Sequence, residues 1–155
     1  MLFRSMVLWE GSCEVHEVIR TEAVVQLKQQ HPDALLIAHP ECKAVILEIA
    51  DYIGSTTGLL EFSKNNPSKK FIVATETGIL HQMKKASPEK EFLIVPSDST
   101  CSCNDCPYMK LNTLEKLMLC MMREQPEITL DPETIRLAER PIRRMLELSN
   151  YPGER

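Results

Sequence analysis

The sequence predicts an α/β fold, with a parallel four-stranded sheet flanked by helices in a three-layer α/β/α unit and followed by C-terminal helices. Four short apolar runs, at residues 6–9, 34–38, 71–75 and 92–96, have the continuous character of strands that are covered on both faces. Segments with helical spacing lie between these runs. Such alternation favours a parallel sheet with right-handed crossovers.

The helices expected between the strands follow from the spacing of their apolar residues. Residues 17–30 form the first helix, and two others are predicted at 58–65 and 77–86. A further helix is expected between the second and third strands, because its apolar residues recur on one face. These residues are Val45, Ile46, Ile49, Ala50 and Ile53.

The pattern becomes purely helical after residue 110, so we divide the chain into an α/β unit at 1–110 and a helical segment at 111–155. Leu114, Leu117, Met118 and Met121 follow helical spacing and are expected to pack in a core, as is Cys120. Pro126 is predicted to end this helix. Asp131 and Pro132 resemble the N-cap and first position of the next helix, which Pro141 would restart or kink.

Composition narrows the function classes. The chain has 155 residues, of which 43% are hydrophobic and 26% charged, and no apolar run approaches the roughly 20 residues that cross a bilayer. Scattered Lys and Arg with a formal charge of -4 give no evident nucleic-acid surface. Six cysteines without an export signal indicate a reducing compartment. We therefore expect a cytoplasmic protein with neither membrane nor nucleic-acid partners.

Polar or metal-capable side chains follow every predicted strand. Cys13 and His16 come after the first strand, and His39 and Glu41 come after the second. Glu76 follows the third strand. Because ligands of open parallel sheets bind beyond the carboxyl ends of the strands, these groups are expected to share one site.

A cysteine-rich loop follows the fourth strand. It contains Cys101, Cys103 and Cys106, whose spacing by itself is compatible with a disulfide, zinc, redox or iron–sulfur role. Ser55 and Thr56 lie between Gly54 and Gly58 at an expected helix N-terminus. That position suits a phosphate or carboxylate, although an ordinary N-cap is the alternative.

Five segments together resemble the C-terminal portion of quinolinate synthase, the iron–sulfur enzyme of de novo NAD biosynthesis. They are LWEGSCEVH, AHPEC, IGSTTGLLEF, VATETGILHQM and CNDCPYMKLNTLEKL, and the resemblance runs in order from about Val7 to Ser149. The combination of Gly-x-Cys-x-Val-His, His-Pro-Glu and Cys-x-x-Cys-Pro-x-Met is specific.

The resemblance implies three related α/β units around a cavity that holds a [4Fe-4S] cluster by three cysteines. Cys13 matches the second ligand and Cys106 matches the third, whereas the upstream units with the first ligand are expected to be absent from this chain. Cys101 and Cys103 fall where some members carry an additional pair, but their spacing differs, so their role stays open.

The resemblance also implies condensation of iminoaspartate with dihydroxyacetone phosphate to quinolinate, with an open iron as Lewis acid. His16, His39 and Glu41 match catalytic positions, with acid–base work for Glu41. Ser55 and Thr56 would bind a substrate carboxylate or phosphate, and Met109 would pack beside the cluster.

Three alternatives remain at this point. The chain is a portion that becomes active with the missing N-terminal half, an inactive truncated form, or a small binding module. In the last case, the cysteine loop with Cys13 or His39 would hold a structural zinc ion.

Overall fold

The computed structural model describes residues 11–96 and 104–149. The chain divides into two compact units, Met1–Leu111 and Asn112–Arg155, and each is described separately. The first predicted strand, at 6–9, lies outside the described residues, as do Cys101 and Cys103.

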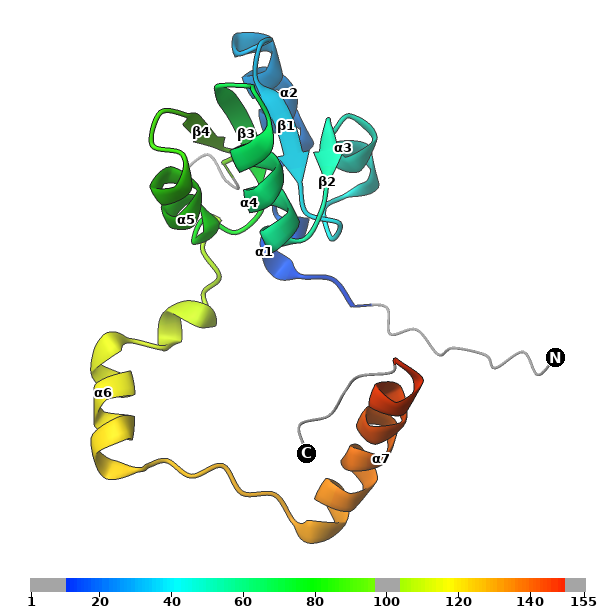
Figure 1. The fold of residues 1–155 in the computed structure, drawn as a ribbon, viewed down its shortest axis with the longest axis vertical. Coiled ribbons are helices and arrows are strands. Elements are labelled where there is room, and N and C mark those ends of the chain that lie inside the picture. Colours follow the sequence, from blue (N-terminus) through cyan, green and yellow to red (C-terminus); the bar gives the residue numbers. More distant parts are fainter. Residues whose placement is uncertain (1–10, 97–103, 150–155) are drawn as a thin grey trace, which may run out of the picture. The chain divides into compact units, whose positions relative to one another are not determined.

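The first unit contains one parallel sheet of four strands in the order β2-β1-β3-β4 (Figure 1). The strands are β1 (Leu35–Ala38), β2 (Tyr52–Ile53), β3 (Lys70–Ala74) and β4 (Glu91–Ile94). Leu36 of β1 pairs with Ile72 of β3, which pairs with Leu93 of β4. The predicted fold class is confirmed, although the described sheet includes β2, which was not predicted, and the predicted strand at 6–9 lies outside the described residues.

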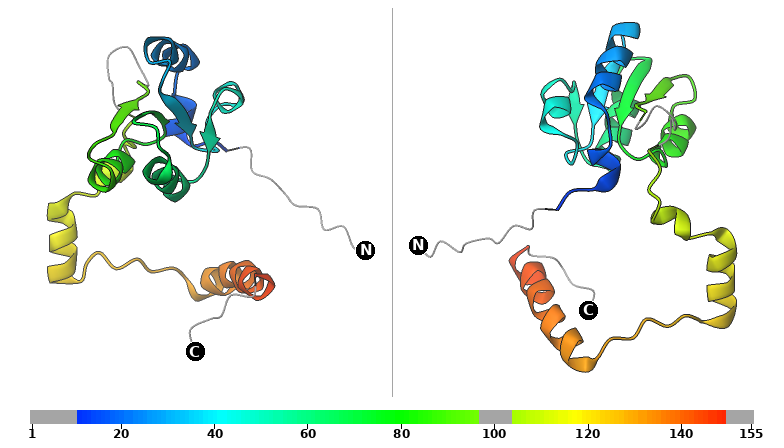
Figure 2. Two further views of the ribbon diagram at one scale, coloured as in Figure 1. Left: turned by 45° about the horizontal axis from the view of Figure 1, so that its top comes forward. Right: turned by 180° about the vertical axis from the view of Figure 1, so that it is seen from behind.

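Helices cover both faces of this sheet, as the front and rear views show (Figures 1 and 2). After the short α1 (Glu14–Glu17), α2 (Thr21–Gln30) and α3 (Ala44–Glu48) cover one face. The helices α4 (Thr56–Asn65) and α5 (Ile79–Ala86) cover the other. Neighbouring residues of β1 therefore enter different cores, Leu36 with α2 and α3 and Ile37 with α4 and α5.

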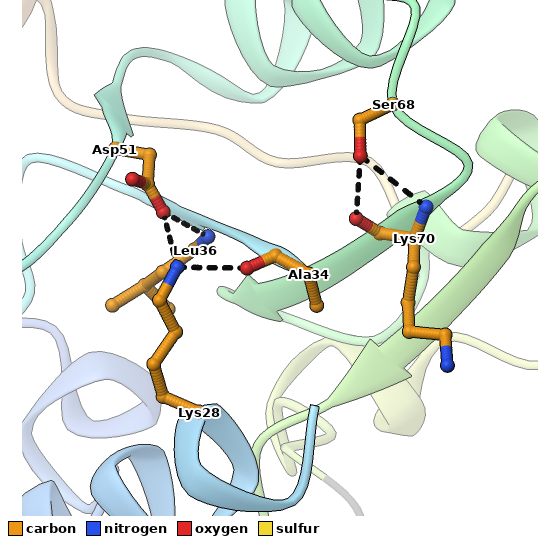
Figure 3. A network of polar contacts seen from close by, with 6 residues as sticks. All are labelled: Lys28, Ala34, Leu36, Asp51, Ser68 and Lys70. Carbon is orange, nitrogen blue, oxygen red and sulfur yellow. Dashed lines mark hydrogen bonds and ion pairs between the residues drawn. The ribbon is translucent and has the colours of Figure 1, made fainter. Parts of the chain in front are cut away.

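The helix expected through Ile53 is shorter than predicted, because the chain leaves it to join the sheet. Asp51 donates its backbone N–H to the Leu36 carbonyl at 2.8 Å, and its carboxylate accepts the Leu36 N–H at 2.7 Å. Lys28 completes this network through Asp51 and the Ala34 carbonyl (Figure 3). The predicted apolar face was wrong for Val45, Ile49 and Ile53, which are exposed, whereas Ile46 is buried.

The second unit contains α6 (Leu114–Arg123) and α7 (Pro132–Leu148). Thr113 caps α6 by accepting the Lys116 N–H, and Asp131 caps α7 by accepting the Thr134 N–H. The helix α7 continues through Pro141 and does not restart there.

The expectation that the apolar stripe of α6 packs in a core was wrong. Leu114 is 83% exposed, Met121 is 75% exposed, and Cys120 is exposed as well. The structure buries no side chain of α6 or α7 among the residues that it describes.

No helix in the described ranges has the length and apolar character needed to span a membrane.

Candidate active site

The carboxyl ends of β1 and β3 form the floor of the candidate site. His39 follows β1 and donates its backbone N–H to the Ala74 carbonyl at 3.1 Å, which extends the pairing of the two strands. The following turn closes when the Cys42 N–H donates to the His39 carbonyl at 3.0 Å. Glu41 is thereby held at the same edge as the residue that follows β3, Thr75.

The short helix α1 brings two further groups to this edge. Cys13 is the N-cap residue of α1, and its carbonyl accepts the backbone N–H groups of His16 and Glu17 at 3.0 Å. His16 is buried, Cys13 is partly exposed and Glu41 is exposed. One potential ligand atom from each of these three residues lies within 4.8 Å of the other two.

The Glu41 carboxylate lies beside two stacked imidazole rings, those of His16 and His39. The rings of His16 and His39 have centroids 4.5 Å apart and an interplanar angle of 9°. Glu41 Oε2 lies 3.2 Å from His16 Nδ1 and 3.5 Å from His39 Nδ1, and the Glu41 backbone N–H donates to His39 Nδ1 at 3.3 Å. The structure thus brings together Cys13 and the three predicted catalytic residues.

Burial determines the protonation of His16. It lowers the pKa of the imidazole, the nearby His39 lowers this pKa further, and Glu41 opposes both effects. Nε2 makes a buried hydrogen bond of 3.0 Å with the Thr75 hydroxyl. Nδ1 lies close to Glu41 but has no aligned hydrogen bond within the described ranges. A largely neutral ring therefore presents Nδ1 for proton exchange.

The segment before Cys106 is attached to the ends of β4 and β3. The Asn104 side-chain amide donates to the Val95 carbonyl at 2.7 Å, and the Asn104 carbonyl accepts the Thr77 N–H at 3.4 Å. Thr77 also donates its hydroxyl to the Asp105 carboxylate. Cys106 is partly exposed directly after these anchors, but it is not in the close group of Cys13, His16 and Glu41.

Ser55, Thr56 and Met109 are exposed, whereas Glu76 is partly exposed and its carboxylate accepts the Gly78 N–H at 2.7 Å. Ser55 caps α4 by accepting the Gly58 N–H at 3.2 Å, and Thr56 is the first residue of that helix. The Gly54 N–H donates to the Ala38 carbonyl at 3.1 Å, so this loop begins at the end of β1. Met109 begins the 3-10 helix η1 (Met109–Leu111) and is 61% exposed.

Sequence reasoning missed two buried polar residues at this edge, Thr75 and Asn104. Thr75 is the only polar residue in the apolar run 71–75, which was the available signal for a special role. Asn104 gave no comparable signal, because its contacts with Val95 and Thr77 depend on the path of a loop.

Comparison with known proteins shows the family to which the chain belongs. The family model for quinolinate synthetase A protein matches residues 2–147. The chain is similar to the quinolinate synthases of Synechococcus sp. (55% identity over 147 residues), Rippkaea orientalis (57% over 147) and Synechocystis sp. (56% over 146). Each match covers 94% of this chain but 45–46% of the relative. The chain thus spans about half the length of these curated relatives, and it belongs to the quinolinate synthetase A family.

Proposed function

We propose that this chain supplies the C-terminal portion of a quinolinate synthase, which condenses iminoaspartate with dihydroxyacetone phosphate to quinolinate for NAD biosynthesis. The observation that carries the proposal is the convergence of Cys13, His16, His39 and Glu41 at one sheet edge of a family member. Because the chain spans about half of its relatives, activity requires the complementary N-terminal portion as a partner.

Cys13 and Cys106 would hold a [4Fe-4S] cluster together with a third thiolate from the complementary portion. Both thiols are free, as cluster ligation requires, and both are partly exposed. Cys42 does not fit this role, because burial raises its pKa to about 11 and its thiol donates to the Ala74 carbonyl. When bound, a cluster with three protein ligands supplies an open iron that acts as a Lewis acid.

The protein residues would move the protons of the reaction. His16 is buried with a lowered pKa, and its Nδ1 lies 3.2 Å from Glu41 Oε2, so a proton can pass between the imidazole and the carboxylate. The exposed Glu41 can exchange that proton with a substrate, and His39 Nδ1 lies near the same oxygen. This arrangement supports the acid–base role proposed for Glu41 in dehydration and tautomerisation.

Substrate anions would bind at the start of α4. The exposed hydroxyls of Ser55 and Thr56 lie at a helix N-terminus, where unpaired N–H groups favour a carboxylate or phosphate. Met109, which is exposed on η1, would pack beside the cluster. The richness in thiols supports a reducing cytoplasmic setting.

The experiment is anaerobic reconstitution of the chain with iron and sulfide, alone and mixed with the N-terminal half of the Synechocystis relative. We expect about four irons per complex and quinolinate formation in the mixture. Cys106→Ala removes both, whereas the matched Cys120→Ala in exposed α6 retains them. A cluster without quinolinate would identify an inactive form, and stoichiometric zinc in place of iron would favour the zinc-binding module.

A further inference from the structure

Thr75 is a polar residue whose side chain is buried at the candidate site. It is fully buried directly after β3, where an apolar residue would satisfy packing. Its hydroxyl lies 3.0 Å from Nε2 of His16, a residue 59 positions earlier in the sequence. A buried hydroxyl that bonds to a distant imidazole fixes the orientation of that ring.

Thr75 is the one aligned hydrogen-bond partner of the His16 ring within the described ranges. The stacked His39 restricts the plane of the ring but does not select whether Nδ1 or Cδ2 faces Glu41. A ring flip would place a carbon atom opposite Thr75 and leave the buried hydroxyl without its partner. The contact with Thr75 therefore determines that Nδ1 lies 3.2 Å from Glu41 Oε2.

We propose that Thr75 is a positioning residue that donates its hydroxyl proton to Nε2 of His16 and keeps the ring proton on Nδ1, facing Glu41. The carboxylate favours a proton on Nδ1, and the nitrogen that then lacks a proton needs a donor, which Thr75 supplies. The role in catalysis rests on the proposed function, whereas the orientation of the ring depends on this chain alone.

The test substitutes Thr75→Val, which keeps the branched shape and removes the hydroxyl, and Thr75→Ser, which keeps the hydroxyl. Two-dimensional 15N NMR of the histidine side chains reports the tautomer of His16 in the intact chain. We expect the Nδ1–H tautomer in the unmodified chain, loss of this single state in Thr75→Val, and its recovery in Thr75→Ser.

Ser63→Ala is the matched control, because Ser63 is also buried and its hydroxyl donates to the Leu60 carbonyl, away from the site. It should leave the His16 signals unchanged. Identical His16 signals in Thr75→Val and the unmodified chain would overturn the proposal, as would an Nε2–H tautomer in the unmodified chain. The latter result needs no variant, so the proposal can be rejected even if Thr75→Val does not fold.

Kinetics of the mixture with the complementary half give a second readout. Thr75→Val should lower kcat about 10- to 100-fold, as for other partners that orient a functional imidazole, with little change in KM. Thr75→Ser should restore most of the rate. If no chain forms quinolinate, the proposed function fails, while the NMR result still decides whether Thr75 orients His16.

Discussion

Gly54 and Gly58 flank Ser55 and Thr56, the predicted substrate-binding residues. Only Gly54 lies too close to its neighbours for a larger residue. A Cβ atom at Gly54 would lie 2.8 Å from Tyr52 Cε1 and 2.9 Å from its hydroxyl oxygen. The Tyr52 ring has little room to retreat, because it stacks on Phe62 with centroids 4.1 Å apart. At Gly58, the nearest atom is the Tyr52 hydroxyl oxygen at 3.1 Å.

We therefore predict that Gly54→Ala lowers the free energy of unfolding by about 1–3 kcal/mol, measured by urea denaturation. Gly58→Ala is the matched control and should be close to neutral, because the helix propensity of alanine offsets the milder contact. The double variant Gly54→Ala/Tyr52→Leu should lose less stability than the sum of the single changes. Equal effects at both glycines would contradict this explanation.

The buried Cys42 and the exposed Cys120 allow a test of how burial changes the reactivity of a thiol in this chain. Burial is the main reason that its pKa rises to about 11, and the nearby charges of Glu41 and Cys13 add to the effect. A thiol with this pKa is ionised in roughly one molecule in a thousand at pH 8, and the thiolate is the reactive form. We predict that iodoacetamide labels Cys42 on the order of 100-fold more slowly than the exposed Cys120, as followed by mass spectrometry. Comparable rates would show that Cys42 is accessible in solution.

At the scale of elements, the Asp51 network joins α2, β1 and the start of β2 (Figure 3). Burial raises the pKa of Asp51, but the hydrogen bond and charge of Lys28 and the Leu36 N–H lower it by more. A folded-state pKa below the unfolded value stabilises the protein above about pH 4, and this contribution disappears as the pH falls through the folded pKa.

We predict that Asp51→Ala costs about 1 kcal/mol at pH 7, since the partly exposed pair contributes little beyond the bond to Leu36. The difference from the unmodified chain should stay constant between pH 7 and about 5 and narrow below about 4. Urea denaturation across this pH range measures the difference in the free energy of unfolding. Glu48→Gln, at an exposed position of α3, is the control. A difference in the free energy of unfolding that does not change with pH would show that the ionised Asp51 carboxylate is not its cause.

The sequence allowed prediction of the elements that are buried on both faces, because continuous apolar character is their direct consequence. The runs at 34–38, 71–75 and 92–96 correspond to β1, β3 and β4. The two-residue β2 is too short for periodicity to detect, and its pairing depends on Asp51. Likewise, the positions after the predicted strands indicated that Cys13, His16, His39 and Glu41 share one edge of the sheet. The hydrogen bond between His16 and Thr75 could not be predicted, because it depends on tertiary packing.

At the scale of the whole molecule, the two units differ in what stabilises their helices. Buried residues from both faces of the sheet stabilise unit one. In contrast, Leu114, Met121 and Ile142 are among the exposed apolar residues of α6 and α7, which have no buried side chain in the described structure. An isolated helix of 10 residues such as α6 is marginal in water, and most of the stability of longer helices such as α7 also comes from tertiary packing.

We therefore predict that amide hydrogens of α6 and α7 exchange far faster than those of β1 and β3 in the isolated chain, as measured by hydrogen exchange with mass spectrometry. Because the relatives contain about as much chain again, addition of the complementary N-terminal half should slow exchange in α6 and α7. The sheet provides the internal reference, since its protection should change little. Protection of α6 and α7 equal to that of the sheet in the chain alone would show that these helices are already packed, and that the complementary half is not required to stabilise them.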